Sequence, residues 1–190
     1  MNNELYDYLR SISSLPEKEL LEIADLVPSA HYPKGTILLR QGDIARNCYF
    51  VLHGCVRQYS YDDDGREHTT NFFTEQQAVV TFTSYSQQAP SQYSLECIED
   101  SLLVVGSLNT EQDMYDSFPQ LKEITRKMME ENFGKTQDAF TAFMTATPEE
   151  RYKTLLKSRP DLPNRVPQYQ LASYLGITPE SLSRIKKRLS

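Results

Sequence analysis

The residues best suited to chemistry lie at the carboxyl end of the chain, between Pro167 and Ser190. Leu182 and Ile185 recur three residues apart, as apolar residues on the core face of a helix do. This phase leaves a polar and basic set mainly on the other faces: Ser181, Ser183, Arg184, Lys187 and Arg188. Side chains of these types bond phosphate oxygens and base edges. The segment therefore predicts a helix that can contact nucleic acid.

The residues before this helix predict a tight turn from a preceding helix. Ala172 is small enough for two helices to cross closely, and Gly176 can adopt the left-handed backbone that ends a helix. Thr178 is a good N-cap, and Pro179 is tolerated at the first helical position. The pattern is that of a helix-turn-helix, whose second helix enters the major groove of DNA. The alternative is an ordinary helical hairpin at the end of a domain.

The charge distribution agrees with contact to DNA at one end only. The net charge is −6, but residues 151–190 hold nine Lys or Arg and two acidic residues, which leaves −13 on residues 1–150. A basic module on an acidic body can dock on phosphates through that module, while the body repels DNA elsewhere. For residues 151–165, a solvated basic face is the simpler alternative.

Length and composition set further limits. The 190 residues suit one large domain or two small ones, and 39% hydrophobic content is enough for a core. No apolar run is long enough to span a membrane, and the polar, acidic start of the chain is unlike a signal peptide, so we expect a cytoplasmic protein without a membrane partner. The three cysteines, Cys48, Cys55 and Cys97, lack the spacing of a zinc site or a disulfide framework. No cofactor or metal is indicated.

Three kinds of segment precede the basic end. Residues 1–27 carry short helical stripes, and residues 32–106 are rich in β-formers between turn residues, which predicts a small sandwich or barrel. Within it, Asp64-Gly65 marks a hairpin between strands at 56–61 and 67–73. Residues 118–145 return to a helical period, and a helix of that length, ~40 Å, would extend beyond a small barrel.

Part of the apolar seam on this long helix therefore needs a partner, and a parallel pair across a two-fold axis would supply it. The residues expected in that dimer interface are Leu121, Ile124, Met128, Asn132, Phe140 and Phe143. The alternative is a core helix of a monomer.

The order of these segments resembles the Crp/Fnr family of bacterial transcription regulators over nearly the whole chain. Lys34–Asp43 and Tyr49–Arg57 look like strands of its cyclic-nucleotide-binding β-roll, and Tyr174–Ile185 looks like its DNA-reading motif. The resemblance implies an α+β fold: N-terminal helices, a small antiparallel β-roll of the jelly-roll type, a long dimerisation helix and a C-terminal helix-turn-helix. The implied domains are 1–117 (sensory roll), 118–146 (dimerisation helix) and 147–190 (DNA binding).

This sequence differs from the cAMP-binding members of the family. Those members carry a Gly-Glu pair and a later Arg-Ser pair around a short helix in the roll. Here Val80-Thr81 and Ser91-Gln92 align with those pairs, so no cation would meet the cyclic phosphate. This difference implies a pocket that is packed shut or that holds a more neutral, unidentified effector. The candidate pocket residues are Val80, Thr81, Phe82, Thr83, Ser91 and Gln92.

Other sensors of the family are not indicated either. The N-terminal cysteine cluster of its iron–sulfur branch is missing, and a haem ligand among His31, His53 and His68 is a weaker interpretation than three structural histidines. The family's β-hairpin wing normally follows the recognition helix, but this sequence ends at Ser190, so little or no wing is expected.

The leading hypothesis is a homodimeric regulator that binds a palindromic operator in double-stranded DNA. By family position, Glu180 and Arg184 fall where base-reading residues sit; Arg could take a guanine edge and Glu could accept from cytosine. The full candidate DNA-binding set is Gln168, Tyr169, Thr178, Glu180, Ser181, Ser183, Arg184, Lys187 and Arg188.

The alternative hypothesis is a dimeric sensor or protein-interaction module with a vestigial helix-turn-helix. We do not expect an enzyme, because the histidine spacing of a cupin metal site, a phosphate loop and a Gly-x-Ser-x-Gly elbow are all absent from the sequence.

Overall fold

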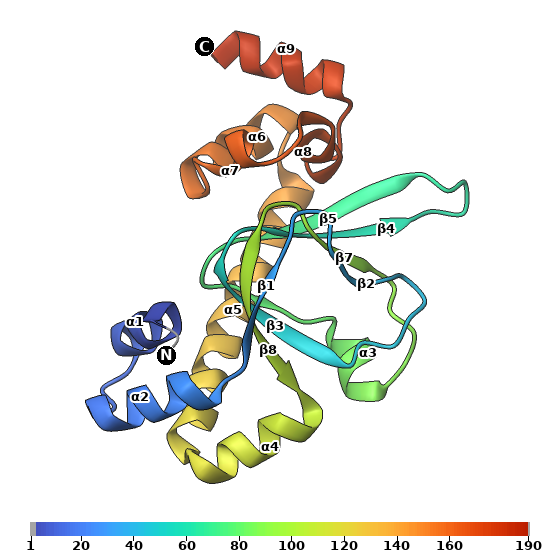
Figure 1. The fold of residues 1–190 in the computed structure, drawn as a ribbon. Coiled ribbons are helices and arrows are strands. Elements are labelled where there is room, and N and C mark those ends of the chain that lie inside the picture. The colour runs from blue at the N-terminus through green and yellow to red at the C-terminus, as the bar shows by residue number, and fades with distance from the viewer. Residues whose placement is uncertain (1–2, 190) are drawn as a thin grey trace. The chain divides into compact units, whose positions relative to one another are not determined.

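The computed structural model describes residues 3–189, except for the side chains of residues 3, 108–111, 128, 131 and 135. The chain forms two compact units (Figure 1). The first holds the residues up to Gln58 together with Phe72–Met129, and the second holds Tyr59–Asn71 together with the residues from Glu130 onward. The limits predicted at residues 117 and 146 stay predictions.

Two N-terminal helices open the first unit, α1 (Asn3–Ile12) and α2 (Glu17–Leu26). They confirm the helical stripes predicted over residues 1–27. Leu5 and Leu9, one turn apart on α1, are buried in a cluster with Ile23 of α2 and with Leu121. This cluster attaches the two helices to the rest of the unit.

Two four-stranded antiparallel sheets form the β-roll, as the sequence predicts. The first has the order β1 (Ser29–Tyr32), β8 (Ser101–Ser107), β3 (Asn47–His53), β6 (Ala78–Val79). The second has the order β2 (Ile37–Leu39), β7 (Ser94–Cys97), β4 (Val56–Tyr61), β5 (Glu67–Phe73). The strands predicted on either side of Asp64-Gly65 are β4 and β5.

The interior of the roll is an apolar cluster that includes Val51, Val56, Leu95 and Leu103. The connection from β3 to β4 turns at Gly54, whose φ is +99°. A Cβ there would stand 2.8 Å from the carbonyl oxygen of Asp100 and would also collide with the Ser101 hydroxyl, so only glycine fits.

A short helix, α3 (Phe82–Gln87), lies within the roll between β6 and β7, and two helices follow the last strand: α4 (Leu108–Ser117) and α5 (Pro119–Thr145). The last confirms the long helix predicted from residue 118 to residue 145. The sequence did not indicate α4, because its residues are mostly polar and show no clear apolar stripe.

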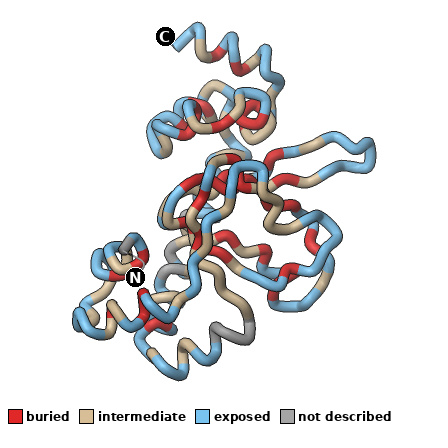
Figure 2. Tube along the Cα trace, viewed as in Figure 1, coloured by how far each residue is buried: buried red, intermediate tan, exposed pale blue. Residues whose placement is uncertain are grey.

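The second unit ends in four helices: α6 (Pro148–Ser158), α7 (Leu162–Arg165), α8 (Gln168–Tyr174) and α9 (Pro179–Leu189). Thr147 and Glu150 form a capping box at the start of α6, where the Thr147 hydroxyl accepts from the Glu150 amide. Buried residues recur through these helices (Figure 2), among them Leu155, Leu162 and Leu171. They give this unit its own core.

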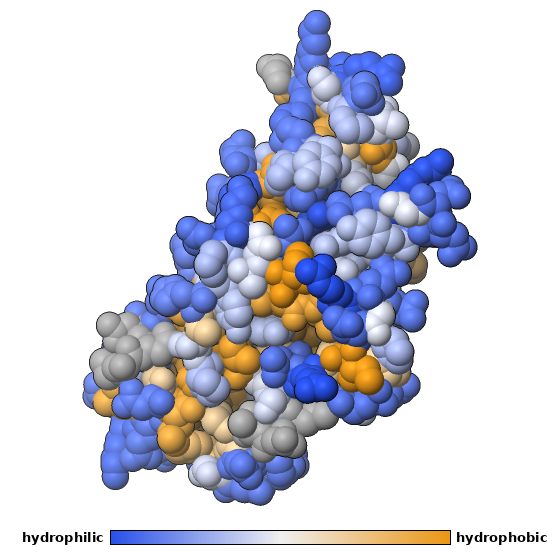
Figure 3. Space-filling view, turned by 45° about the vertical axis from the view of Figure 1, so that its right-hand side comes forward, coloured by the Kyte–Doolittle hydropathy of each residue, from blue (hydrophilic) through white to orange (hydrophobic). Residues whose placement is uncertain are grey.

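Figure 3 shows one face, on which hydrophilic side chains predominate and apolar ones gather in separate patches. Among the described residues, no helix combines the length and the apolar content needed to cross a membrane.

Candidate nucleic-acid interface and sensory roll

The turn between α8 and α9 has the hydrogen bonds of a Schellman motif. The Ile177 amide donates to the Ala172 carbonyl and the Gly176 amide donates to the Ser173 carbonyl, each at 3.0 Å. Gly176 has φ +70°, the left-handed conformation that this motif needs. The role that the sequence assigned to Gly176 is therefore confirmed.

The two helices pack through the apolar residues that the sequence placed on their core face. Leu171, Ala172, Leu182 and Ile185 are all buried, and the small Ala172 is fully so. At the start of α9, the Ser181 amide donates to the Thr178 hydroxyl at 3.2 Å, which caps the helix as expected. Packing and capping together fix which face of α9 points away from the core.

That outer face carries the candidate base-reading residues. Glu180, Ser183, Arg184 and Lys187 are exposed, whereas Ser181 is half-buried. A guanidinium nitrogen of Arg184 donates to the Ser181 hydroxyl at 3.3 Å. Arg184 thus lies along the helix with its charge in solvent, where a guanidinium can meet a base edge or a phosphate.

Glu180 places a negative charge on the same face. A hydrogen bond from its own backbone amide, and then one from Thr178, lower the pKa of this exposed carboxyl. The side chain is therefore an acceptor only at neutral pH. It would repel phosphate, but it can accept from the amino group of cytosine.

The remaining candidates are held by partners in the second unit. Arg188 lies 3.4 Å from the carboxylate of Glu149, and Gln168 donates to the Pro163 carbonyl at 3.1 Å. Tyr169 is 59% exposed. Sequence reasoning missed Lys186, whose ammonium donates to the Gln168 side-chain carbonyl at 2.8 Å and so joins α9 to the start of α8.

Arg151 on α6 is a second residue that sequence reasoning missed. Its Nε donates to the Phe143 carbonyl at 3.0 Å, and its Nη1 donates to the Leu175 carbonyl at 3.1 Å. Its guanidinium also stacks over the Phe143 ring, 3.9 Å from the ring centre. Arg151 thereby ties the end of α5 to the turn that orients α9.

The hairpin of β4 and β5 also contributes to the second unit. Its residues 59–71 belong there, and the Thr69 amide donates to the Ser173 hydroxyl of α8 at 2.9 Å. At the hairpin tip, Asp62 accepts from His68 at 2.8 Å, and this bond lowers the pKa of the Asp62 carboxyl.

The six candidate pocket residues of the roll do not form one polar site. Thr81 and Ser91 are buried, but Phe82, Thr83 and Gln92 are exposed. The Ser91 hydroxyl donates to the Tyr93 carbonyl at 2.7 Å, within its own loop. The Thr81 hydroxyl has no hydrogen-bond partner, and Val80 lines a separate apolar cavity.

Arg57 of β4 is a buried cation in the β-roll. Its Nη1 lies 3.7 Å from the Glu96 carboxylate. Strand neighbours alternate between faces, and Val56 of β4 and Cys97 of β7 both belong to the apolar interior cluster. Arg57 and Glu96 therefore occupy the other face of this sheet, away from the position of a ligand inside the roll.

No described group of three or more His, Cys, Asp or Glu side chains is arranged to hold a metal ion. The three cysteines form no disulfide, and Cys55 and Cys97 are buried. Burial raises the pKa of the Cys97 thiol to about 11, so this side chain is a neutral part of the core.

The residues predicted for the dimer interface of α5 lie in different surroundings. Leu121 is buried against the N-terminal helices, and Ile124, Asn132 and Phe143 are half-buried. Phe140 is 65% exposed, and the side chain of Met128 lies outside the described residues.

A different set of apolar side chains on α5 is exposed to solvent, and all of its members are described. Phe133, Phe140 and Met144 are 72%, 65% and 63% exposed. Their spacing of seven and then four residues places them on one face at the a and d positions of a heptad. Phe133 was missed because Asn132 and Gly134 interrupt the apolar pattern around it.

Comparisons with known proteins agree with this architecture. Residues 29–117 match the cyclic nucleotide-binding domain family. The fumarate and nitrate reduction regulatory protein of Yersinia pestis is 23% identical over 190 aligned residues, covering 92% of this chain and 74% of that protein.

Two solved structures share the fold. The c-di-GMP responsive global regulator CLP of Xanthomonas campestris superposes with a TM-score of 0.69 at 19% identity, covering 92% of this chain and 91% of that one. FixK2 of Bradyrhizobium japonicum gives a TM-score of 0.68 at 20% identity, covering 86% and 84%.

Fold, family model and relatives agree on one class, the regulators built from a cyclic-nucleotide-binding roll and a C-terminal helical region. Residues 29–117 match the cyclic nucleotide-binding domain family, and the chain as a whole is similar to regulators of the Crp/Fnr type. The relatives that match over nearly the whole chain are named as regulatory proteins.

Proposed function

We propose that the chain is a homodimeric transcription regulator that binds a palindromic operator through α9 and answers to an effector other than cAMP. The observation that carries this proposal is the exposed face of α9. Arg184 and Lys187 stand there in solvent, while Leu182 and Ile185 hold the opposite face in the core. The regulatory names of the relatives support the same function.

The dimensions of α9 suit a major groove. Its 11 residues give a rod of roughly 16 Å, and the groove is about 12 Å wide. Glu180 and Arg184 lie in its first half, where recognition helices contact base edges. We assign the phosphate contacts to Lys187 and Arg188, with Gln168 and Tyr169 at the start of α8.

Two further features support the dimer and the choice of effector. The exposed stripe of Phe133, Phe140 and Met144 offers an apolar seam for a second copy of α5. In the roll, no cation faces the position of a cyclic phosphate among the six candidate residues, and Arg57 is directed to Glu96. We place the sensory, dimerisation and DNA-binding segments at 1–117, 118–146 and 147–190, in a cytoplasmic protein.

The direct test is selection of duplexes from a random DNA pool with the purified chain. The expected product is an imperfect palindrome whose half-sites lie about 34 Å apart, one turn of DNA. Arg184→Ala should cost about 1–3 kcal/mol on that operator and relax preference at one base pair per half-site. Lys187→Ala should weaken all sequences alike and lower the slope of affinity against salt by about one.

The contrast between these variants decides the role of α9. Uniform losses in both variants would show that the helix does not read bases. If the wild type enriches no sequence while still forming a dimer, the chain is a sensor or interaction module with a vestigial helix-turn-helix. The net charge of −6 is the observation that favours this second function.

A further inference from the structure

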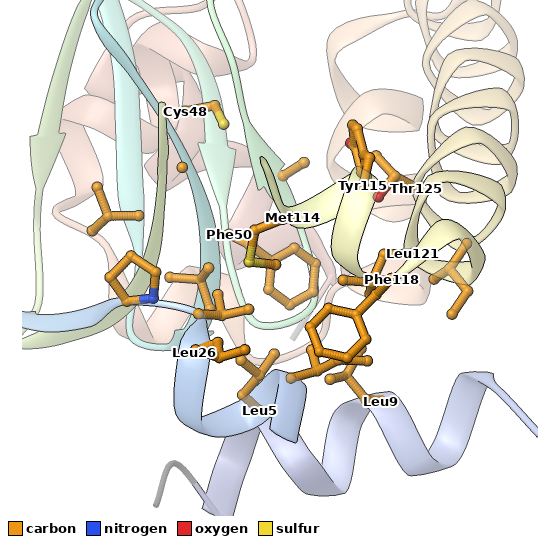
Figure 4. Close-up of a pocket in the computed structure, with 18 of the residues that line it drawn as sticks. Leu5, Leu9, Leu26, Cys48, Phe50, Met114, Tyr115, Phe118, Leu121 and Thr125 are labelled. Carbon is orange, nitrogen blue, oxygen red and sulfur yellow. The ribbon is translucent and has the colours of Figure 1, made fainter. Parts of the chain in front are cut away.

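The first unit contains an apolar cavity of about 510 Å³ that lies outside the interior of the roll. Its walls come from α1, α2, the α4–α5 corner and the first sheet. In Figure 4, Phe50 and Met114 face a space that Leu9, Phe118 and Leu121 border from the helices. Phe50 neighbours Tyr49 and Val51 of the interior cluster on β3, so by strand alternation it lies on the opposite face of that sheet.

The cavity is partly open to the surface, and its lining is mostly apolar. A contiguous exposed apolar surface of this kind marks an interaction or ligand-binding site more often than ordinary exterior. Ligand pockets span roughly 300–1,000 Å³ and are mostly apolar with a few polar groups. The cavity matches that description in both volume and composition.

The volume is in the range of small-molecule pockets, so we take a small molecule as the occupant and make a second copy of the chain the competing outcome of the test.

The lining restricts the charge of that molecule. None of the described lining residues is Lys, Arg or His, and the single ionisable acid, Asp113, is exposed. An anion buried here would have no cationic partner, which is costly in an apolar site. The hydroxyl of Thr125, on the α5 side in Figure 4, is suited to one neutral polar group.

We propose that this cavity binds an uncharged apolar molecule of small-ligand size that carries one hydrogen-bonding group. Because Leu121 and Ile124 of α5 line the cavity, a bound molecule contacts the base of the long helix. Its role as the effector of DNA binding rests on the function proposed above, whereas the binding site itself does not.

The test uses the full chain and the neutral dye N-phenyl-1-naphthylamine, whose fluorescence rises in apolar sites. We expect saturable binding of one dye per chain, displaced by decanol. Decanoate, which has the same chain length but a negative charge, should compete at least about tenfold more weakly. The titration contains no DNA, so it is independent of operator binding.

A charge placed in the wall should reverse this selectivity. In Thr125→Lys, the new ammonium meets the cavity, so decanoate should gain affinity and decanol should lose it. Thr141→Lys is the matched control, since Thr141 lies on the same helix, is exposed and does not line the cavity. A variant that merely misfolds could not gain decanoate binding.

Three results would overturn the proposal. The first is the absence of saturable dye binding in the wild type. The second is equal competition by decanol and decanoate, or equal behaviour of the two lysine variants. The third is dye binding that falls as the protein associates at higher concentration, which would show that a second copy of the chain covers the cavity.

Discussion

In the helix-turn-helix, the residues that the motif requires are present and placed. Gly176 closes the turn, Thr178 caps α9, and Arg184 stands in solvent. In the β-roll, the turns and the apolar interior are equally well formed, but the residues that we expect to align with the Glu and Arg of cAMP-binding members are Thr81 and Ser91. The helix-turn-helix therefore has both the fold and the residue types that the proposed DNA contacts require, whereas the roll has the fold without the residues that a cyclic phosphate would require. A shared fold does not carry over a shared ligand.

The largest effect is expected from changes in the long helix α5. If the chain is a dimer through α5, both the β-roll and the helix-turn-helix depend on this helix for their arrangement. Phe133→Asp with Phe140→Asp places two charges in the exposed stripe. If the stripe is buried against a second copy, dimerisation should weaken by about 3 kcal/mol or more. Sedimentation velocity should then show monomers, with operator affinity lost as well.

The control for that variant uses the opposite face of the same helix. Ala139→Asp with Ala142→Asp adds the same charge at exposed positions and should leave the dimer intact. A wild type that is monomeric at micromolar concentration would contradict the dimer, as would equal behaviour of the two double variants.

Features that are set by residues close together in the sequence could be predicted, whereas features that are set by distant residues could not. The helix-turn-helix is local: Gly176, Thr178 and Pro179 lie within four residues and report on one turn. The strands on either side of Asp64-Gly65 were likewise predicted with their observed limits, because the turn signal lies between them.

Features built by distant residues were not predictable. Arg151 contacts Leu175, 24 residues away, and no periodicity reveals that bond. The apolar cavity takes its walls from helices and strands between Leu5 and Met129. Such a space is defined only when the elements are assembled, since each lining residue looks like core when read alone.

The stability of the roll should depend strongly on a residue that its fold requires, Gly54, which has no part in ligand binding. Gly54→Ala adds a Cβ against the Asp100 carbonyl at a left-handed φ, and we expect a loss of about 2–3 kcal/mol in the free energy of unfolding. Gly65→Ala is the matched variant, because φ there is also positive but nothing lies within 4 Å of the added Cβ. Urea unfolding should show the larger loss at Gly54; equal losses would mean that strain, not the clash, sets the cost.

The helix-turn-helix should respond to a residue that lies outside its own two helices. Arg151→Met removes two hydrogen bonds to backbone carbonyls and the stacking on Phe143, which should cost about 1–2 kcal/mol. Lys157→Met, on the exposed side of α6, should cost much less. Hydrogen exchange at the Gly176 and Ile177 amides is the informative measurement. Faster exchange in Arg151→Met alone would confirm that Arg151 holds the turn, and unchanged protection would contradict it.

The smallest expected effect is the response to cAMP, and it tests the sensory half of the comparison directly. A buried cyclic phosphate needs charge-assisted hydrogen bonds, and Ser91 cannot supply the charge that an arginine would. Titration calorimetry should therefore show no saturable heat at micromolar cAMP. A stoichiometric heat in the wild type would contradict this expectation, because Arg57 lies on the opposite face of its sheet beside Glu96 and cannot serve as the missing cation. The phosphate would then be held by neutral donors such as backbone amides, and the roll would bind the cyclic nucleotide without the charge that an arginine supplies.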